Sequence, residues 1–230
     1  MSATGAGVRV TTPADERLRT IALVLGVVGG IFCAGLFAGW RLERFDADRG
    51  FRAEAERIAG VLRLAPGVSV GDIRAGTGRW TVAMARRVGP TGQVYATVGP
   101  NPAHELLQTV AEGGVDNVSV ITRTPGASPR LPLGCCEAIL VRAVYHDFQD
   151  RRTLLRSLGK NLKPGGLLAI IDFDEGTAEH ASGHGIARRT VASEVINAGF
   201  ELRETYAHWS GNAFCLVFRQ PELEAPPVRQ

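Results

Sequence analysis

The stretch DIRAGTGRW, residues 72–80, has the composition of a turn that wraps around a nucleotide-like cofactor. Such turns place glycine, alanine or serine at each tight point, because a side chain there would block the approach of the backbone to the ligand. Gly76 and Gly78 meet that need and Asp72 adds a carboxylate, whereas Arg74 brings a long cationic side chain to a tight point. The stretch indicates either a cofactor site with an unusual residue or a turn that has lost its ligand.

A second group of polar residues, Tyr145, His146 and Asp147, follows directly on the apolar run EAILVRAV at 137–144. His146 could act as a general base, because an unperturbed imidazole titrates near neutral pH. A histidine in a polar loop can also serve only as a local hydrogen-bond partner. The residues alone leave both roles open.

Other residues with metal-binding chemistry do not have the spacing of a metal site. His180 and His184 lie among glycines without a suitably spaced third ligand, which a zinc site requires. Asp46 and Asp48 begin a DADRG stretch that lacks the bidentate glutamate of a calcium loop. The sequence therefore predicts no metal ion.

Composition narrows the possible functions further. The chain has 230 residues, of which 45% are hydrophobic, and a net charge of +3. Its arginines are scattered, so no basic face for nucleic acid is expected. The four cysteines are Cys33, Cys135, Cys136 and Cys215. They show no CxxC spacing, and adjacent cysteines rarely close on each other, so neither a zinc site nor a disulfide framework is expected.

The elements that must position these residues alternate between strand and helix. Apolar strands are predicted at 68–73, 93–98, 117–122, 137–144 and 167–173, and helices at 81–88, 104–113, 154–162 and 190–198. The segments FELRETYAHW and AFCLVFR suggest a closing antiparallel pair. This alternation predicts a parallel sheet with helices on both faces. Ligands of such sheets lie beyond the C-terminal ends of the strands, where DIRAGTGRW is expected.

The order of these segments resembles the class I S-adenosylmethionine-dependent methyltransferases over roughly residues 52–219. The resemblance rests on DIRAGTGRW, VGPTGQVYAT, LPLGCCEAILVRAVYHDF, LKPGG and GHGI…VINAGFEL, in that order. It is strongest to small bacterial methyltransferase-like proteins with an N-terminal hydrophobic leader. The resemblance implies an α/β, Rossmann-like doubly wound sheet, mainly parallel, with an antiparallel C-terminal hairpin.

The same resemblance implies where S-adenosylmethionine would be held. In the family an acidic residue ends the first strand, and a glycine-rich turn meets the methionine part of the cofactor. Asp72, Gly76 and Gly78 match this pattern, and Arg74 replaces the first glycine. A guanidinium in the pocket would place a cation next to the cofactor's sulfonium, which is unfavourable.

Two further contacts implied by the family are changed as well. The carboxylate that accepts both ribose hydroxyls would align with Val98, and the next acidic residue is Glu105. The acidic or amide group near the adenine amine would align near Thr124. The cofactor site is therefore expected to be degenerate at Arg74, Val98 and Thr124.

Residues 21–40 (IALVLGVVGGIFCAGLFAGW) are uncharged and mainly apolar. A helix of that length spans about 30 Å, the thickness of a bilayer core. Flanking arginines and the interfacial Trp40 suit a retained transmembrane helix. A cleaved signal peptide is the alternative, but Leu36 lies where a small residue would be required for cleavage after Ala38.

Small residues recur every fourth position along this span, at Ala22, Gly26, Gly30, Ala34 and Ala38. Such a stripe lets two helix backbones approach closely in lipid, although glycine and alanine are also common in membrane helices generally. The stripe predicts packing against the transmembrane helix of another membrane protein.

The side of the membrane that the domain faces follows from two conflicting cues. More arginines follow the span than precede it, which favours a cytoplasmic domain. A short N-terminal tail more often stays inside and sends the rest of the chain across. The sequence leaves the side open, with the periplasm as the favoured expectation.

The expected organisation is a tail (1–20), a transmembrane helix (21–40), a connecting helix (41–64), a methyltransferase-like domain (65–219) and a C-terminal tail (220–230). The changed pocket favours a non-catalytic accessory or assembly subunit of a membrane complex, without a cofactor. The alternative is an active S-adenosylmethionine-dependent methyltransferase acting on a membrane-associated substrate. A third interpretation has Arg74 bind an anion.

Overall fold

The structure is a computed structural model that describes residues 48–99, 103–122, 128–175 and 185–222. The chain divides into two units, Met1–Arg52 and Ala53–Gln230, and the sheet belongs to the second. The predicted transmembrane span at 21–40 lies outside the described residues. Among the helices that are described, none has the length and apolar character needed to cross a bilayer.

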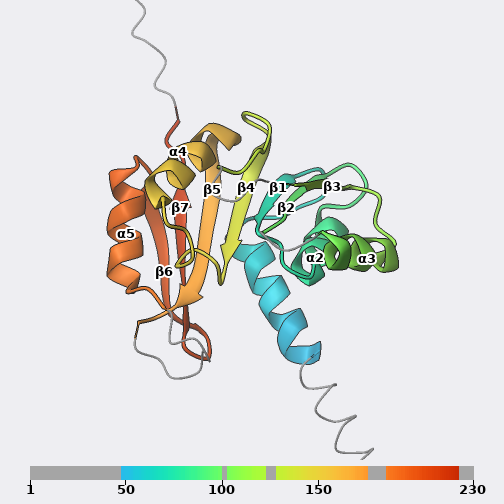
Figure 1. The fold of residues 1–230 in the computed structure, drawn as a ribbon, viewed down its shortest axis with the longest axis horizontal. Helices are drawn as coiled ribbons and strands as arrows, with labels where there is room; N and C mark the ends of the chain where they lie inside the picture. The colour runs from blue at the N-terminus through green and yellow to red at the C-terminus, as the bar shows by residue number, and fades with distance from the viewer. Residues whose placement is uncertain (1–47, 100–102, 123–127, 176–184, 223–230) are drawn as a thin grey trace, which may run out of the picture. The chain divides into compact units, whose positions relative to one another are not determined.

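A seven-stranded sheet with the order β3-β2-β1-β4-β5-β7-β6 forms the centre of the domain (Figure 1). Its strands are β1 (Ser69–Ile73), β2 (Gln93–Thr97), β3 (Val118–Ile121), β4 (Cys136–Arg142), β5 (Leu162–Phe173), β6 (Glu201–Ser210) and β7 (Ala213–Arg219). β1 to β5 pair in parallel, and β7 pairs antiparallel with both β5 and β6. The predicted doubly wound, mainly parallel sheet with an antiparallel C-terminal hairpin is confirmed.

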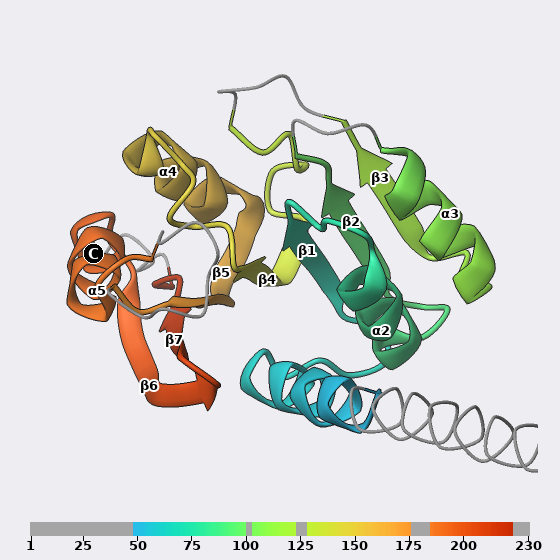
Figure 2. The same cartoon turned by 60° about the horizontal axis from the view of Figure 1, so that its bottom comes forward.

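Helices cover both faces of this sheet (Figure 2). They are α2 (Arg79–Val88), α3 (His104–Gly113), α4 (Arg151–Asn161) and α5 (Arg188–Asn197), with a further helix described from 48 to 61. Leu155, Leu158 and Val195 from α4 and α5 bury their side chains in one core cluster. Met84 from α2 and Ile58 bury theirs in the cluster on the other face. Apolar strands that are buried on both sides are typical of parallel sheets.

A buried ionic group holds the helix that ends at residue 61 against the sheet. The Glu54 carboxylate accepts hydrogen bonds from Nε and Nη2 of Arg142, both at 3.1 Å, and from Nε1 of Trp209 at 3.0 Å. The Arg142 guanidinium in turn lies 4.3 Å from the centre of the Trp80 ring. Glu54 thus joins this helix to β4 and β6 in one network.

The segment LKPGG departs from the sequence-based expectation of a break between helix and strand. It lies inside β5, where Cys136 pairs with Leu162 and Ala138 pairs with Leu167. The extra residues on β5 form a bulge, which Gly165 accommodates with φ of 76°. Such bulges insert residues without ending the strand, which is why a local rule based on proline and glycine was wrong here.

The expectation that adjacent cysteines stay apart is also wrong. Cys135 and Cys136 are joined by a disulfide at the start of β4, and Cys215 is buried and free. Gly134, with φ of 58°, turns the chain immediately before the pair. The turn is compatible with both sulfurs lying on the same side of the chain.

Candidate functional site

The turn after β1 is built on backbone conformations that favour glycine. Arg74, Gly76 and Gly78 all have positive φ angles, 54°, 57° and 87°. The Arg74 backbone N–H donates to Thr97 Oγ1 at 2.9 Å, and the Ala75 N–H donates to the Thr97 carbonyl, also at 2.9 Å. A non-glycine residue in the left-handed region is uncommon, so the end of β2 holds Arg74 in a conformation that its side chain disfavours.

The two glycines of this turn differ in what surrounds them. A Cβ atom on Gly78 would lie 2.5 Å from Leu106 Cδ1 of α3, whereas a Cβ on Gly76 would meet nothing within 4 Å. Gly78 therefore lets α2 start close to Leu106 of α3, a packing role that residue spacing alone did not predict. Gly76 faces open space.

Asp72 is buried rather than open to the crevice. Its Oδ2 accepts a hydrogen bond from the Thr81 hydroxyl of α2 at 2.6 Å. Burial raises the pKa of the Asp72 carboxyl from 3.8 to about 6, opposed by the Thr81 hydrogen bond and the Arg142 charge, which lower it. The carboxylate that the sequence assigns to cofactor binding is hydrogen-bonded to the first turn of α2.

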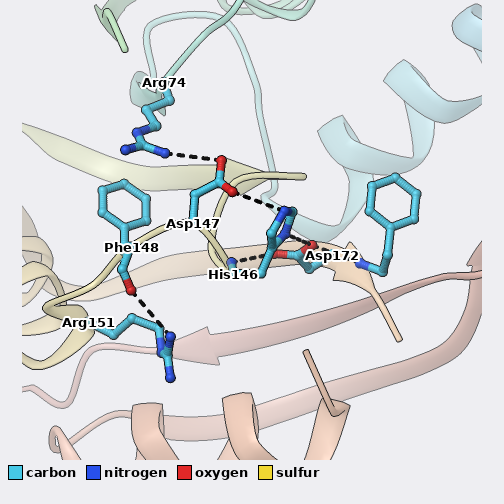
Figure 3. A network of polar contacts seen from close by, with 7 residues as sticks. Arg74, His146, Asp147, Phe148, Arg151 and Asp172 are labelled. Atoms are coloured by element: carbon cyan, nitrogen blue, oxygen red, sulfur yellow. Dashed lines mark hydrogen bonds and ion pairs between the residues drawn. The ribbon is translucent and has the colours of Figure 1, made fainter. Parts of the chain in front are cut away.

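The Arg74 side chain reaches from the end of β1 to the loop after β4 (Figure 3). Its Nη1 lies 3.2 Å from Asp147 Oδ2, and its Cζ lies 4.3 Å from the centre of the Phe148 ring. The side chain is 19% exposed, and its Nε is buried without a hydrogen-bond acceptor. Arg74 therefore forms an ion pair and a cation–π contact across the edge of the sheet.

His146 is held between two carboxylates. Its Nδ1 lies 2.7 Å from Asp172 Oδ1 and its backbone N–H donates to Asp172 Oδ2 at 3.0 Å. Its Nε2 lies 3.2 Å from Asp147 Oδ1. Asp172 thereby fixes the orientation of the ring, and Nε2 faces the Asp147 carboxylate.

Asp172 is the functional residue that the sequence analysis missed. It is fully buried at the end of β5 and fixes both the backbone and the ring of His146. A carboxylate inside the apolar run LLAIIDF was a signal that could have identified it, because a buried charge requires a partner.

Tyr145 points away from His146 and Asp147. Its side chain is fully buried, and its hydroxyl donates to Glu194 Oε2 of α5 at 2.8 Å. Glu194 is also bound by Nε and Nη2 of Arg151, at 2.8 and 2.9 Å. Burial, followed by the hydrogen bond and charge of Glu194, raises the pKa of Tyr145 well above its usual range. Of the three candidate residues after β4, the structure brings two together at the sheet edge.

The position after β2 is apolar. Val98 is 7% exposed and packs with Ala75, Ala96 and Leu106, and its N–H donates to the Ile121 carbonyl at 3.0 Å. Glu105 is exposed in the first turn of α3. Thr124 lies outside the described residues. Within the described ranges no three potential metal ligands form a group.

A sequence model of the ubiE/COQ5 methyltransferase family matches residues 42–183. Among curated proteins, the demethylmenaquinone methyltransferase of Listeria monocytogenes serotype 4a is 29% identical over 119 residues, covering 50% of this chain and 48% of that protein. The demethylmenaquinone methyltransferase of Staphylococcus aureus strain JH9 is 25% identical over 137 residues, covering 58% and 53%. The chain thus spans about half the length of these relatives.

Solved structures share the fold at low identity. A SAM dependent methyltransferase from Aquifex aeolicus superposes with a TM-score of 0.64 at 20% identity, covering 72% of this chain and 88% of that one. The [4+2]-cyclase SpnF superposes with a TM-score of 0.61 at 17% identity, covering 73% and 80%. Proteins of this fold therefore include one described as a cyclase, and the fold alone does not fix a reaction.

Proposed function

The chain belongs to the ubiE/COQ5 methyltransferase family, and we propose that it is a member that does not transfer methyl groups. In this proposal the domain serves as a non-catalytic accessory or assembly subunit at a membrane. The observation that carries it is the position of the Arg74 guanidinium.

Arg74 occupies the turn that meets the methionine part of the cofactor in the class I methyltransferases. Its side chain is held over Phe148 and against Asp147 instead of pointing to solvent. A sulfonium placed beside it would meet a like charge, which disfavours binding of the charged cofactor. The residues of this turn therefore do not fit S-adenosylmethionine.

The residue at the expected ribose contact also disfavours binding of S-adenosylmethionine. Val98 offers an apolar side chain packed against Leu106, where the family has a carboxylate for the ribose hydroxyls. A hydrogen bond to a charged group contributes about 1.5–3 kcal/mol. Its loss corresponds to roughly ten- to a hundredfold weaker binding.

The membrane part of the proposal rests on sequence alone. The apolar span at 21–40 supplies a single-pass anchor, and its stripe of small residues suits the transmembrane helix of another protein. A domain that no longer needs a cofactor can retain its fold as a contact surface. The periplasmic side is favoured, because S-adenosylmethionine is not expected there.

Calorimetric titration of the full chain in mild detergent tests the proposal. The wild-type protein should give no binding heat with S-adenosylmethionine at about 100 μM, well above a micromolar Kd. The double variant Arg74→Gly/Val98→Asp should regain micromolar binding, and each single variant should regain less. Circular dichroism of each variant checks folding, since Val98 is buried. Micromolar binding by the wild type would contradict the proposal.

An active methyltransferase is the second candidate, favoured by the relatives. The matched curated proteins carry the name demethylmenaquinone methyltransferase, which points to a membrane-associated quinone precursor as substrate. Asp72, Gly76 and Gly78 keep the family pattern. This function requires Arg74 to leave Asp147. Transfer of a labelled methyl group from S-adenosylmethionine to a quinone fraction by the wild-type chain would establish it.

A further inference from the structure

The Asp147 carboxylate lies between the Arg74 guanidinium and the His146 ring at the edge of the sheet. Its Oδ2 is 3.2 Å from Arg74 Nη1, and its Oδ1 is 3.2 Å from His146 Nε2 (Figure 3). We propose that Asp147 occupies the place of an external carboxylate, and that the Arg74 side of the sheet edge binds a small organic carboxylate that displaces it. This deepens the proposed function, because it assigns an anionic ligand to the residues that do not suit a sulfonium.

Arg74 has a hydrogen-bond donor to spare for such a ligand. Nη1 contacts Asp147, while Nε is buried and has no acceptor. A guanidinium that binds a carboxylate side-on uses Nε and one Nη together, which is the stronger bidentate geometry. If the Arg74 guanidinium turns toward an external carboxylate, Nε gains the acceptor that it lacks while Arg74 is paired with Asp147.

His146 supplies a second polar group with a fixed direction. Asp172 is fully buried and holds Nδ1 at 2.7 Å and the His146 backbone N–H at 3.0 Å. The ring is thereby oriented with Nε2 toward Asp147. If Asp147 leaves, Nε2 remains directed at the same place, because Asp172 still holds the other side of the ring.

Asp147 itself is suited to leave. Its side chain is 52% exposed, in contrast to 11% for His146 and 19% for Arg74. Hydration compensates the carboxylate when it swings out, because an exposed ion pair contributes little to stability. The His146 ring stays in place, held by Asp172, while Arg74 turns to the ligand in place of Asp147.

The test uses succinate as the probe and the full chain in mild detergent at constant ionic strength. The Nε–H signal of Arg74 in ¹⁵N-edited NMR spectra, assigned by its absence in Arg74→Lys, reports binding at the site. Asp147→Asn should lower the Kd for succinate by about tenfold or more relative to wild type, because it removes a tethered competitor at high effective concentration. Adding Arg74→Lys, which keeps the charge but loses the planar donor pair, should abolish that gain.

Asp116→Asn is the matched control, because Asp116 is an exposed acid before β3, at the opposite edge of the sheet. It changes the net charge equally and should leave the Kd for succinate unchanged. An equal gain in Asp116→Asn, or no gain in a folded Asp147→Asn, overturns the inference. A His146→Gln variant in the Asp147→Asn background should lose part of the gain, and an unchanged Kd there removes His146 from the site.

Failure of this inference is distinguishable from failure of the proposed function. If succinate does not bind and S-adenosylmethionine does not bind either, only the carboxylate site is refuted. If S-adenosylmethionine binds the wild type at micromolar concentration, the proposed function fails whatever succinate does.

Discussion

At the scale of single residues, the chemistry of the sheet edge is set by charges that compensate each other. Arg74, Asp147, His146 and Asp172 form a continuous series from the end of β1 to the end of β5. Arg74 pairs with Asp147, and the buried Asp172 carboxylate has the His146 ring and backbone N–H as its partners. Each buried polar group of the series except Arg74 Nε therefore has a partner.

Asp72 is the residue whose ionisation should limit stability at neutral pH. Its pKa is about 6 in the fold against 3.8 for an unperturbed aspartate, so the folded state binds the proton more tightly. Such a group favours folding most below the lower value, and its contribution is lost as the pH rises to about 6. We expect Asp72→Asn to raise the free energy of unfolding at pH 7 by on the order of 3 kcal/mol.

Denaturant unfolding of both proteins between pH 3.5 and 8 measures this difference, with about 1.4 kcal/mol expected for each unit of pKa shift. The gain should vanish near the acid end of that range. Asp116→Asn, at an exposed position, serves as the control and should show no gain. A gain that does not depend on pH would exclude the desolvated carboxylate as its cause.

At the scale of elements, the turn after β1 serves packing as well as any ligand. Gly78 lets α2 begin directly against Leu106 of α3, and Thr97 of β2 anchors the turn through Arg74 and Ala75. The strand, the turn and both helices therefore depend on one another. This dependence can preserve the turn even where no cofactor is bound.

Two alanine substitutions separate backbone strain from close packing in this turn. Gly76→Ala adds a side chain at φ of 57° in open space and should cost about 1 kcal/mol of unfolding free energy. Gly78→Ala adds a side chain at φ of 87° and places Cβ against the buried Leu106, so it should cost about 2–4 kcal/mol. Thermal and denaturant unfolding measure both. Equal losses would show that the contact with α3 is readily relieved.

At the scale of the whole molecule, the proposal joins an anchor predicted from sequence to a domain of the ubiE/COQ5 family. The predicted membrane anchor and the proposed loss of the cofactor are independent of each other, and either could exist without the other. The side of the membrane on which the domain lies would connect them, because a domain in the periplasm would have no supply of S-adenosylmethionine.

Reporter fusions at the C-terminus test that link. We expect a fused alkaline phosphatase to be active and a fused green fluorescent protein to be dark, as follows from a periplasmic domain. The same fusions to a chain that lacks residues 1–40 should reverse both signals, because the predicted span would then be missing. A fluorescent full-length fusion would place the domain in the cytoplasm and favour the methyltransferase alternative.

The sequence by itself determined the order and type of the elements. Apolar runs such as EAILVRAV predicted strands that are buried on both faces, and periodicity predicted α3 within its observed bounds. Motif order predicted the fold, because each motif lies at a junction between elements. These signals are local, and local preferences agree with the final fold at those positions.

Only the tertiary structure decided which polar groups meet. Parallel pairing brings the ends of β1, β4 and β5 to one edge of the sheet. Arg74 can therefore reach Asp147, and Asp172 can hold His146. These residues are far apart in the sequence, so no local sequence pattern predicts the contacts. The same packing turned Tyr145 toward α5 and Asp72 toward α2. Side-chain direction depends on burial and on partners from distant strands, and these exist only once the sheet has formed.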